Sequence, residues 1–163
     1  LARTRIAPVA APRSPTSIAA VASDVIEVVR RMPSAAALHF SVEVKDDVFL
    51  EVDPGDLAEI LGNLLENAAR FAASSIRITG SRTATDTTIV IVDDGPGIAD
   101  SDRPSALMRG VKLDAGPGTG LGLAIVSDIV EAYGGRVELA DAKRGLRVTL
   151  TFPARDRGGP SGT

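Results

Sequence analysis

The sequence contains no cysteine and no tryptophan, and only one tyrosine, one histidine and four phenylalanines. The absence of cysteine excludes disulfide bonds and thiolate metal sites, and it fits a reducing compartment. There is no run of about 18 apolar residues and no signal-peptide pattern, so we do not expect this chain itself to be inserted in a membrane. A net charge of −3 provides no overall basic field, which argues against nucleic acid as a partner.

The length of 163 residues, 44% of them hydrophobic, is sufficient for one domain with a sizeable core. Residues 1–16 are rich in alanine, arginine and proline, which predicts a linker from a preceding domain. Residues 154–163 show no apolar periodicity and are predicted to be a disordered tail. The chain begins with Leu1 rather than methionine, so we expect a fragment whose folded domain spans residues 17–153.

Apolar periodicity predicts an α+β fold with helices on one face of a sheet. The strands at 37–44 and 48–52 flank a polar Lys-Asp-Asp segment, which predicts a hairpin. The strands at 75–82 and 85–94 are predicted to form a second hairpin. Helices are predicted at residues 17–32, 56–72 and 120–133, and strands at 37–44, 48–52, 75–82, 85–94, 135–140 and 146–152. The residues predicted to form the core-facing stripe of the first helix are Ile18, Val21, Val25, Val28 and Val29.

The helix predicted at residues 56–72 carries a polar face opposite its apolar stripe. Glu59, Asn63, Asn67 and Arg70 follow one another at helical spacing, with Phe71 beside them. Two asparagines in mid-helix are unfavourable because their amides compete for backbone hydrogen bonds, and a merely solvated face would not need them. Amide oxygens beside a carboxylate are suited to Mg²⁺, and Arg70 is suited to an anion. A solvated polar face is the alternative interpretation.

Two glycine-rich segments lie on either side of a polar loop. The segment "DDGPGI" (93–98) follows an apolar strand directly, and "GPGTGLG" (116–122) leads into an apolar-periodic helix. Alternating glycines let successive N–H groups turn toward one point, and a helix N-terminus adds partial positive charge, so the second segment predicts a phosphate site. A flexible linker is the alternative, and neither the P-loop nor the dinucleotide-binding glycine pattern is present.

The order of these segments resembles the ATP-binding domain of the GHKL (Bergerat) superfamily, which includes sensor histidine kinases, gyrase-type ATPases, Hsp90 chaperones and MutL. The segment "RGVKLDAGPGTGLGLAIVSDIVEAYGG" is especially similar to histidine kinases. The resemblance implies a two-layer α/β sandwich, with a mixed sheet of about five strands covered on one face by three helices.

The resemblance to histidine kinases also implies ATP and Mg²⁺ as cofactors and a role in two-component signalling. The γ-phosphate would pass to a histidine on a separate dimerisation and phosphoacceptor domain of the same protein, and a response regulator would be a further partner. The chain would then be the cytoplasmic catalytic part of a membrane-anchored sensor.

By resemblance, five residues of the helix at 56–72 acquire expected roles. Asn67 would be a Mg²⁺ ligand, and Asn63 would orient the metal and the phosphates. Glu59 would act as a base or polarising group. Arg70 would lie near the phosphates, and Phe71 would pack against adenine.

The glycine-rich segments are expected to hold the two ends of the nucleotide. Asp93 would accept a hydrogen bond from the adenine amino group, and Arg109 and Lys112 would reach the γ-phosphate. The other residues expected to contact the nucleotide are Gly95, Gly97 and Ile98 around the base, and Gly118, Thr119, Gly120, Leu121 and Gly122 over the phosphates.

Three alternatives remain open at this point. One is another GHKL ATPase of the gyrase or Hsp90 kind, although the chain ends about ten residues after "TFP". Another is an anti-sigma serine kinase, and a third is a degenerate domain that only binds a partner, since Leu107 and Met108 stand where kinases commonly have phenylalanine. The only histidine, His39, is predicted to be a packed or edge residue of a strand, so the phosphoacceptor is expected outside this chain.

Overall fold

The structure, a computed structural model, describes residues 14–97, 101 and 122–154. Within these residues it contains three α-helices, one short 3₁₀ helix and seven strands. In chain order these are β1 (Thr16–Ser17), α1 (Ile18–Val29), the 3₁₀ helix η1 (Pro33–Ala35), β2 (His39–Val44), β3 (Phe49–Leu50), α2 (Pro54–Phe71), β4 (Ser75–Arg82), β5 (Asp86–Asp93), α4 (Gly122–Ala132), β6 (Arg136–Asp141) and β7 (Leu146–Pro153).

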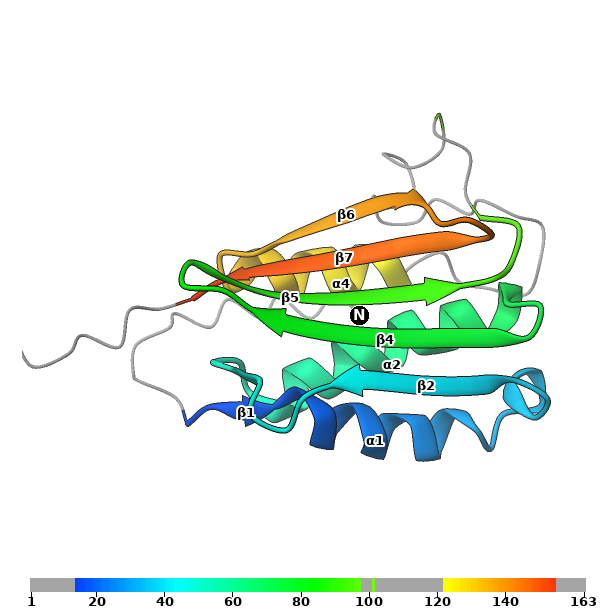
Figure 1. Cartoon of the computed structure of the whole chain (residues 1–163), viewed down its shortest axis with the longest axis horizontal. Coiled ribbons are helices and arrows are strands. Elements are labelled where there is room, and N and C mark those ends of the chain that lie inside the picture. The colour runs from blue at the N-terminus through cyan, green and yellow to red at the C-terminus, as the bar shows by residue number, and fades with distance from the viewer. Residues whose placement is uncertain (1–13, 98–100, 102–121, 155–163) are drawn as a thin grey trace, which may run out of the picture.

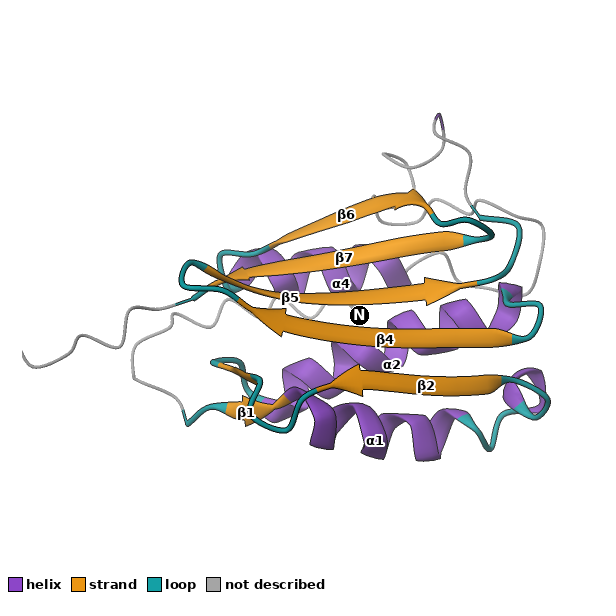
Figure 2. Cartoon of the chain, viewed as in Figure 1, coloured by secondary structure: helices purple, strands orange, loops and turns teal. Residues whose placement is uncertain are grey.

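Five strands form one mixed sheet in the order β2-β4-β5-β7-β6 (Figure 1). β2 runs parallel to β4, whereas the other three neighbouring pairs are antiparallel. The helices α1, α2 and α4 cover one face of this sheet (Figure 2). This arrangement confirms the predicted two-layer α+β fold.

Burial alternates along β5 and shows which side chains face the helices. Thr87, Ile89, Ile91 and Asp93 are buried, and the residues between them are only half-buried. Because successive side chains of a strand point to opposite faces, Asp93 belongs to the face that carries the core. The Asp93 carboxylate therefore lies at the edge of the core, at the point where β5 ends.

Helix α2 begins two residues before the predicted start because its N-terminus is capped. The Asp53 carboxylate accepts hydrogen bonds from the N–H groups of Gly55 (2.8 Å) and Asp56 (3.3 Å), and Pro54 occupies the first turn. The predicted apolar stripe of this helix is confirmed. Its buried residues include Leu57, Ile60, Leu61, Leu64, Leu65 and Ala68.

The hairpin predicted for residues 37–44 and 48–52 is wrong. β2 pairs in parallel with β4, and β3 pairs instead with β1 in a separate two-stranded sheet. β3 contains only two residues before the capped start of α2, so it is too short to pair along the whole of β2. The helix then connects β3 to β4, which takes the place beside β2. The hairpin predicted from the next two strands is confirmed as β4 and β5.

The prediction that Val28 of α1 faces the core is also wrong, because 64% of this residue is exposed. The buried stripe of α1 consists of Ile18, Ala22, Val25, Ile26 and Val29, and Val28 lies on its flank. Among the described helices, none combines the length and hydropathy needed to cross a membrane.

Candidate functional site

Asp93, the last residue of β5, is a buried carboxylate with 6% of its surface exposed. Its carboxylate accepts a hydrogen bond from the backbone N–H of Gly95, at 2.9 Å, and the backbone N–H of Leu146 lies close enough to lower its pKa. Burial raises the pKa of Asp93 above its ordinary value, although the two N–H groups act in the opposite direction. The side chain is therefore an oriented acceptor at the edge of the core, and binding a polar donor would relieve the cost of its burial.

Asp94, the next residue, points to a different set of partners. Its Oδ1 accepts hydrogen bonds from the backbone N–H groups of Ala73 (2.9 Å), Ser74 (2.9 Å) and Ser75 (3.0 Å), and its Oδ2 accepts one from the Ser74 hydroxyl. The Ser74 hydroxyl, followed by the backbone N–H groups, holds the pKa of Asp94 far below its ordinary value. Asp94 thus fastens the end of β5 to the connection between α2 and β4.

The segment that follows β5 lies directly against the C-terminal end of α2. A Cβ atom placed on Gly95 would lie 2.2 Å from the carbonyl oxygen of Phe71, so only glycine fits at this position. The Phe71 side chain is 40% exposed at the end of the helix. An exposed aromatic ring therefore lies on the residue whose backbone touches the Asp93 segment, which suits the expected contact with a base.

The polar face of α2 meets the start of α4. The Asn63 Nδ2 donates to the carbonyl oxygen of Glu59 at 2.8 Å, and a Cβ atom placed on Gly122 would lie 3.5 Å from the Asn63 Oδ1. The Asn63 amide is therefore held by its own helix, with its oxygen on the side of α4. Glu59 and Asn67 are half-buried on the same helix, and Arg70 is exposed.

The residues present fit Mg²⁺ held partly by a nucleotide. Among the residues that the structure describes, no cluster of three or more His, Cys, Asp or Glu side chains could hold a metal ion by itself. Mg²⁺ does not need such a cage, because it retains waters and binds through one or two protein oxygens together with substrate phosphates. Asn63 and Asn67 supply amide oxygens of this kind, one helical turn apart.

The structure therefore brings together α2, the end of β5 and the start of α4, which carry Asn63, Asp93 and Gly122 respectively. Two features of this region were not predicted from the sequence. One is Asp94, which binds the backbone of residues 73–75, and the other is the turn between β6 and β7, which lies against Asp93. The "DD" pair contained a signal for Asp94, since strand alternation places its side chain opposite that of Asp93. The predicted site residues that lie outside the described residues are Ile98, Arg109, Lys112, Gly118, Thr119, Gly120 and Leu121.

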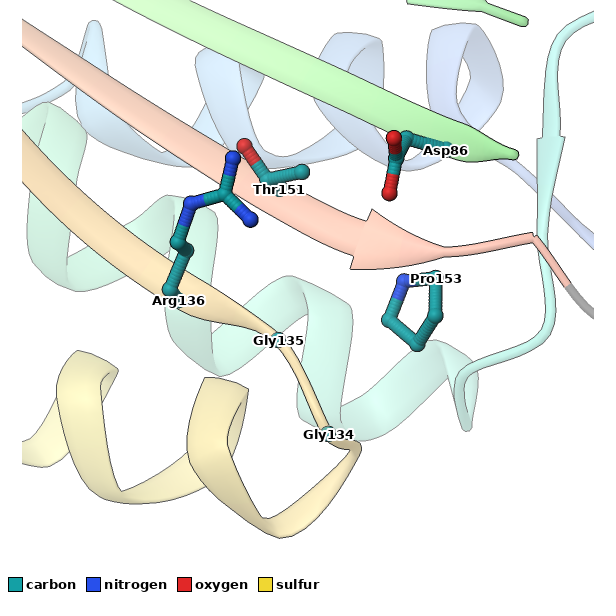
Figure 3. A pocket seen from close by; sticks show the side chains of 6 residues that line it. All are labelled: Asp86, Gly134, Gly135, Arg136, Thr151 and Pro153. Atoms are coloured by element: carbon teal, nitrogen blue, oxygen red, sulfur yellow. The ribbon is translucent and has the colours of Figure 1, made fainter.

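A shallow hollow of about 170 Å³ lies at the opposite end of β5 (Figure 3). It is bordered by Asp86, Arg136 and Thr151 and by the backbone of Gly134 and Gly135. Asp86 and Asp93 are the two ends of an eight-residue strand, so the hollow lies about 24 Å from the Asp93 site at ~3.4 Å per residue. It is therefore separate from the place where the predicted residues converge.

The sequence model of the family described as "Histidine kinase-, DNA gyrase B-, and HSP90-like ATPase" matches residues 52–156. This range is more than half of the chain and contains Asn63, Asn67, Asp93 and Gly122. The chain belongs to this family of ATPases. The membership confirms the superfamily that the motif order indicated, and it supports ATP as the nucleotide.

Within this ATPase family the chain is similar to sensor histidine kinases. It is 44% identical over 108 residues to the sensor protein kinase CarS of Pseudomonas aeruginosa. These aligned residues make up 65% of this chain and 24% of CarS. The solved structure of the mycobacterial sensor histidine kinase MprB matches with a TM-score of 0.75 at 29% identity, covering 88% of this chain and 98% of that chain. Full-length ShkA in complex with AMPPNP matches with a TM-score of 0.70 at 28% identity, covering 92% of this chain and 33% of that chain.

These similarities fit the catalytic ATP-binding domain of a sensor histidine kinase better than the alternatives drawn from the sequence. They favour it over a gyrase-like or Hsp90-like ATPase, an anti-sigma serine kinase and a degenerate partner-binding domain. The chain spans about a quarter of the length of CarS, so it corresponds to one part of such a kinase.

Proposed function

We propose that the chain binds Mg-ATP between α2 and the end of β5, with the Asp93 carboxylate accepting a hydrogen bond from the adenine amino group. The observation that supports this most directly is the buried Asp93 carboxylate at the end of β5, held by the Gly95 N–H beside the C-terminal end of α2. An amino group that donates to this carboxylate would compensate for its burial. The absence of a side chain on Gly95 lets the segment after β5 lie against the end of α2, where the exposed Phe71 ring could pack against a base.

In this proposal the asparagine pair belongs to the phosphate end of the nucleotide. Mg²⁺ neutralises phosphate charge, and Asn67 and Asn63 are the residues that would hold it. Gly122 begins α4 beside Asn63, and a helix N-terminus favours anions. Glu59 is proposed as the polarising acid and Arg70 as a cation near the phosphates. The proposed contacts of Arg109 and Lys112 with the γ-phosphate follow from their place in the sequence alone.

We further propose that the γ-phosphate is transferred to a histidine on a separate dimerisation domain of the same protein, in two-component signalling to a response regulator. Phosphoryl transfer depends on holding the nucleophile in line with the γ-phosphate. The chain's single histidine, His39, is the first residue of β2, and its backbone N–H donates to the carbonyl of Ser74. It is fixed in the sheet rather than carried on a helix that could present it. We also propose that residues 17–153 form a catalytic domain in the cytoplasmic part of a membrane-anchored sensor, with residues 1–16 as the linker before it and residues 154–163 as a tail.

The nucleotide proposal is tested by calorimetry with two nucleotides in the presence of Mg²⁺. One is ATP, and the other is purine riboside triphosphate, which lacks the 6-amino group. Asp93→Ala is expected to weaken ATP binding by roughly 1 to 3 kcal/mol, or about 5- to 150-fold, and to affect the analogue much less. Asp86→Ala, at the other end of the same strand, is the matched control and should leave both affinities unchanged. Equal loss for ATP and the analogue would refute the role of Asp93.

The transfer proposal is tested with radiolabelled ATP. The chain alone is expected to bind ATP without labelling itself, and the histidine-bearing domain of the same protein should become labelled only when the two are mixed. Acid-labile label on His39 in the isolated chain would contradict this proposal, because the acceptor would then lie within this chain.

A further inference from the structure

The turn between β6 and β7 closes directly on Asp93. Gly145 in this turn has a φ of +83°, a conformation that residues with side chains rarely adopt. A Cβ atom placed on it would lie 2.1 Å from the Asp93 carbonyl oxygen and 2.7 Å from the Asp93 Oδ1. Residue 145 therefore has neither the backbone conformation nor the space for a side chain.

The same turn also makes polar contact with the Asp93 side chain. The backbone N–H of Leu146, the residue after Gly145, lies close enough to the Asp93 carboxylate to lower its pKa. Gly97, in the segment after β5, also lies against this turn, since a Cβ atom placed on it would lie 3.0 Å from the Gly145 carbonyl oxygen. The segment after β5 and the turn before β7 are therefore packed backbone against backbone around one carboxylate.

We propose that Gly145 is a positioning residue for adenine selection. Its missing side chain lets the β6–β7 turn approach Asp93 closely enough for the Leu146 N–H to hold the carboxylate that meets the adenine amino group. This inference rests on the proposed role of Asp93 in nucleotide binding. Any side chain at position 145 would push the turn and Asp93 apart, and the Leu146 N–H would move away from the carboxylate that Gly95 also holds.

A matched control for backbone strain exists in the same part of the chain. Gly134 has a φ of +78°, close to that of Gly145, but its added Cβ atom would meet only the Pro153 Cγ, at 3.6 Å. Gly134 precedes β6 whereas Gly145 follows it, so the two glycines lie at opposite ends of that strand. Alanine at either position imposes a similar conformational cost, and only alanine at 145 collides with Asp93.

The test measures affinities for ATP and purine riboside triphosphate in Gly145→Ala, Gly134→Ala, Asp93→Ala and the double variant of residues 93 and 145. Gly145→Ala is expected to lower ATP affinity roughly tenfold while changing that of the analogue little, so that selectivity for the amino group falls. In the Asp93→Ala background the same change should leave the ratio of the two affinities almost unchanged, because the carboxylate that reads the amino group is already absent. Gly134→Ala should keep the parent's selectivity. Equal losses for both nucleotides in Gly145→Ala, or a change in selectivity that persists in the Asp93→Ala background, would show that Gly145 is only structural.

A second measurement serves if Gly145→Ala does not fold. In an NMR pH titration of the parent chain, the amide protons of Leu146 and Gly95 are expected to shift with one shared midpoint, and Asp93→Asn should abolish both shifts. The neighbouring Asp94 is distinguishable because hydrogen bonds hold its pKa far below the ordinary value. A Leu146 amide that does not follow Asp93 would overturn the inference. Asp93→Ala could leave nucleotide selectivity unchanged while the Leu146 amide still shifts with the titration of Asp93. In that case the proposed role of Asp93 in adenine binding is wrong, whereas the contact between Leu146 and Asp93 is correct.

Discussion

Replacing Asp94 by alanine is expected to destabilise the domain and to weaken nucleotide binding, although Asp94 itself is not proposed to touch the nucleotide. Its carboxylate accepts hydrogen bonds from the backbone N–H groups of Ala73, Ser74 and Ser75 and from the Ser74 hydroxyl. These bonds fasten the end of β5 to the segment just after α2. Without them, the Asp93 and Gly95 backbone would no longer be held firmly against the end of that helix.

The size of the effect follows from four hydrogen bonds in a partly exposed place. A hydrogen bond to a charged group contributes about 1.5 to 3 kcal/mol, but solvent screening and water that replaces the lost carboxylate reduce this. At about 0.5 kcal/mol for each of the four donors, Asp94→Ala should lower the free energy of unfolding by about 2 kcal/mol. Asp94→Asn keeps an acceptor oxygen but loses the charge, so it should cost roughly half as much.

Urea denaturation of the parent and both variants at neutral pH measures these differences. The midpoint should fall in the order parent, Asp94→Asn, Asp94→Ala, with an unchanged dependence on urea. Because the folded pKa of Asp94 is lowered, its contribution should be complete above the unfolded value of about 3.9 and should decrease as pH falls below it. Equal stability of parent and Asp94→Ala at pH 7, or a difference that grows on acidification, would refute the reasoning.

Two further predictions concern the helices on either side of the site. Asn67→Ala should remove most of the Mg²⁺ dependence of ATP affinity while Glu66→Ala, its exposed neighbour, retains it; equal dependence in both would mean that the asparagine only faces solvent. Tyr133→Phe removes a hydroxyl that donates to the buried Asp56 carboxylate and accepts from the Asp53 N–H, so it should lower the free energy of unfolding by roughly 1 to 2 kcal/mol. Tyr133 follows the C-terminal end of α4, whereas Gly122 is at the other end, so the ATP affinity of the folded variant should stay within about twofold of the parent. Thermal denaturation measures the loss of stability, and calorimetry on the folded variant measures the ATP affinity.

The local elements of this domain could be predicted from the sequence, because periodicity records which side of an element faces the core. The apolar stripe of α2 and the strand that ends at Asp93 are both present in the structure as predicted. The face on which Asp93 lies was visible only in the burial pattern of β5, because the sequence from Ile89 to Val92 is apolar throughout. The asparagine pair and the glycine segments indicated the family from the sequence alone, and the family match over residues 52–156 agrees.

The partner of each strand could not be predicted in the same way. The apolar residues of β2 suit a strand beside β3 or beside β4 equally well, and alternation carries no information about the neighbour. The choice depends on the shortness of β3 and on the connection through α2, which brings β4 into the parallel position. The exposure of Val28 has a similar origin, since its place on α1 depends on how the helix rolls against the elements it covers.

The sequence by itself determined that Asp93 is an acid at a buried strand end, among glycines that allow close approach. Only the tertiary structure decided what surrounds that acid, namely the Gly95 N–H, the turn at Gly145 with the nearby Leu146 N–H, and the Asp94 anchor on the connection after α2. The physical reason is that these contacts use backbone N–H groups, which nearly every residue possesses, so no residue type marks the donors. Their partners become neighbours only when strands distant in the chain are brought together in one sheet.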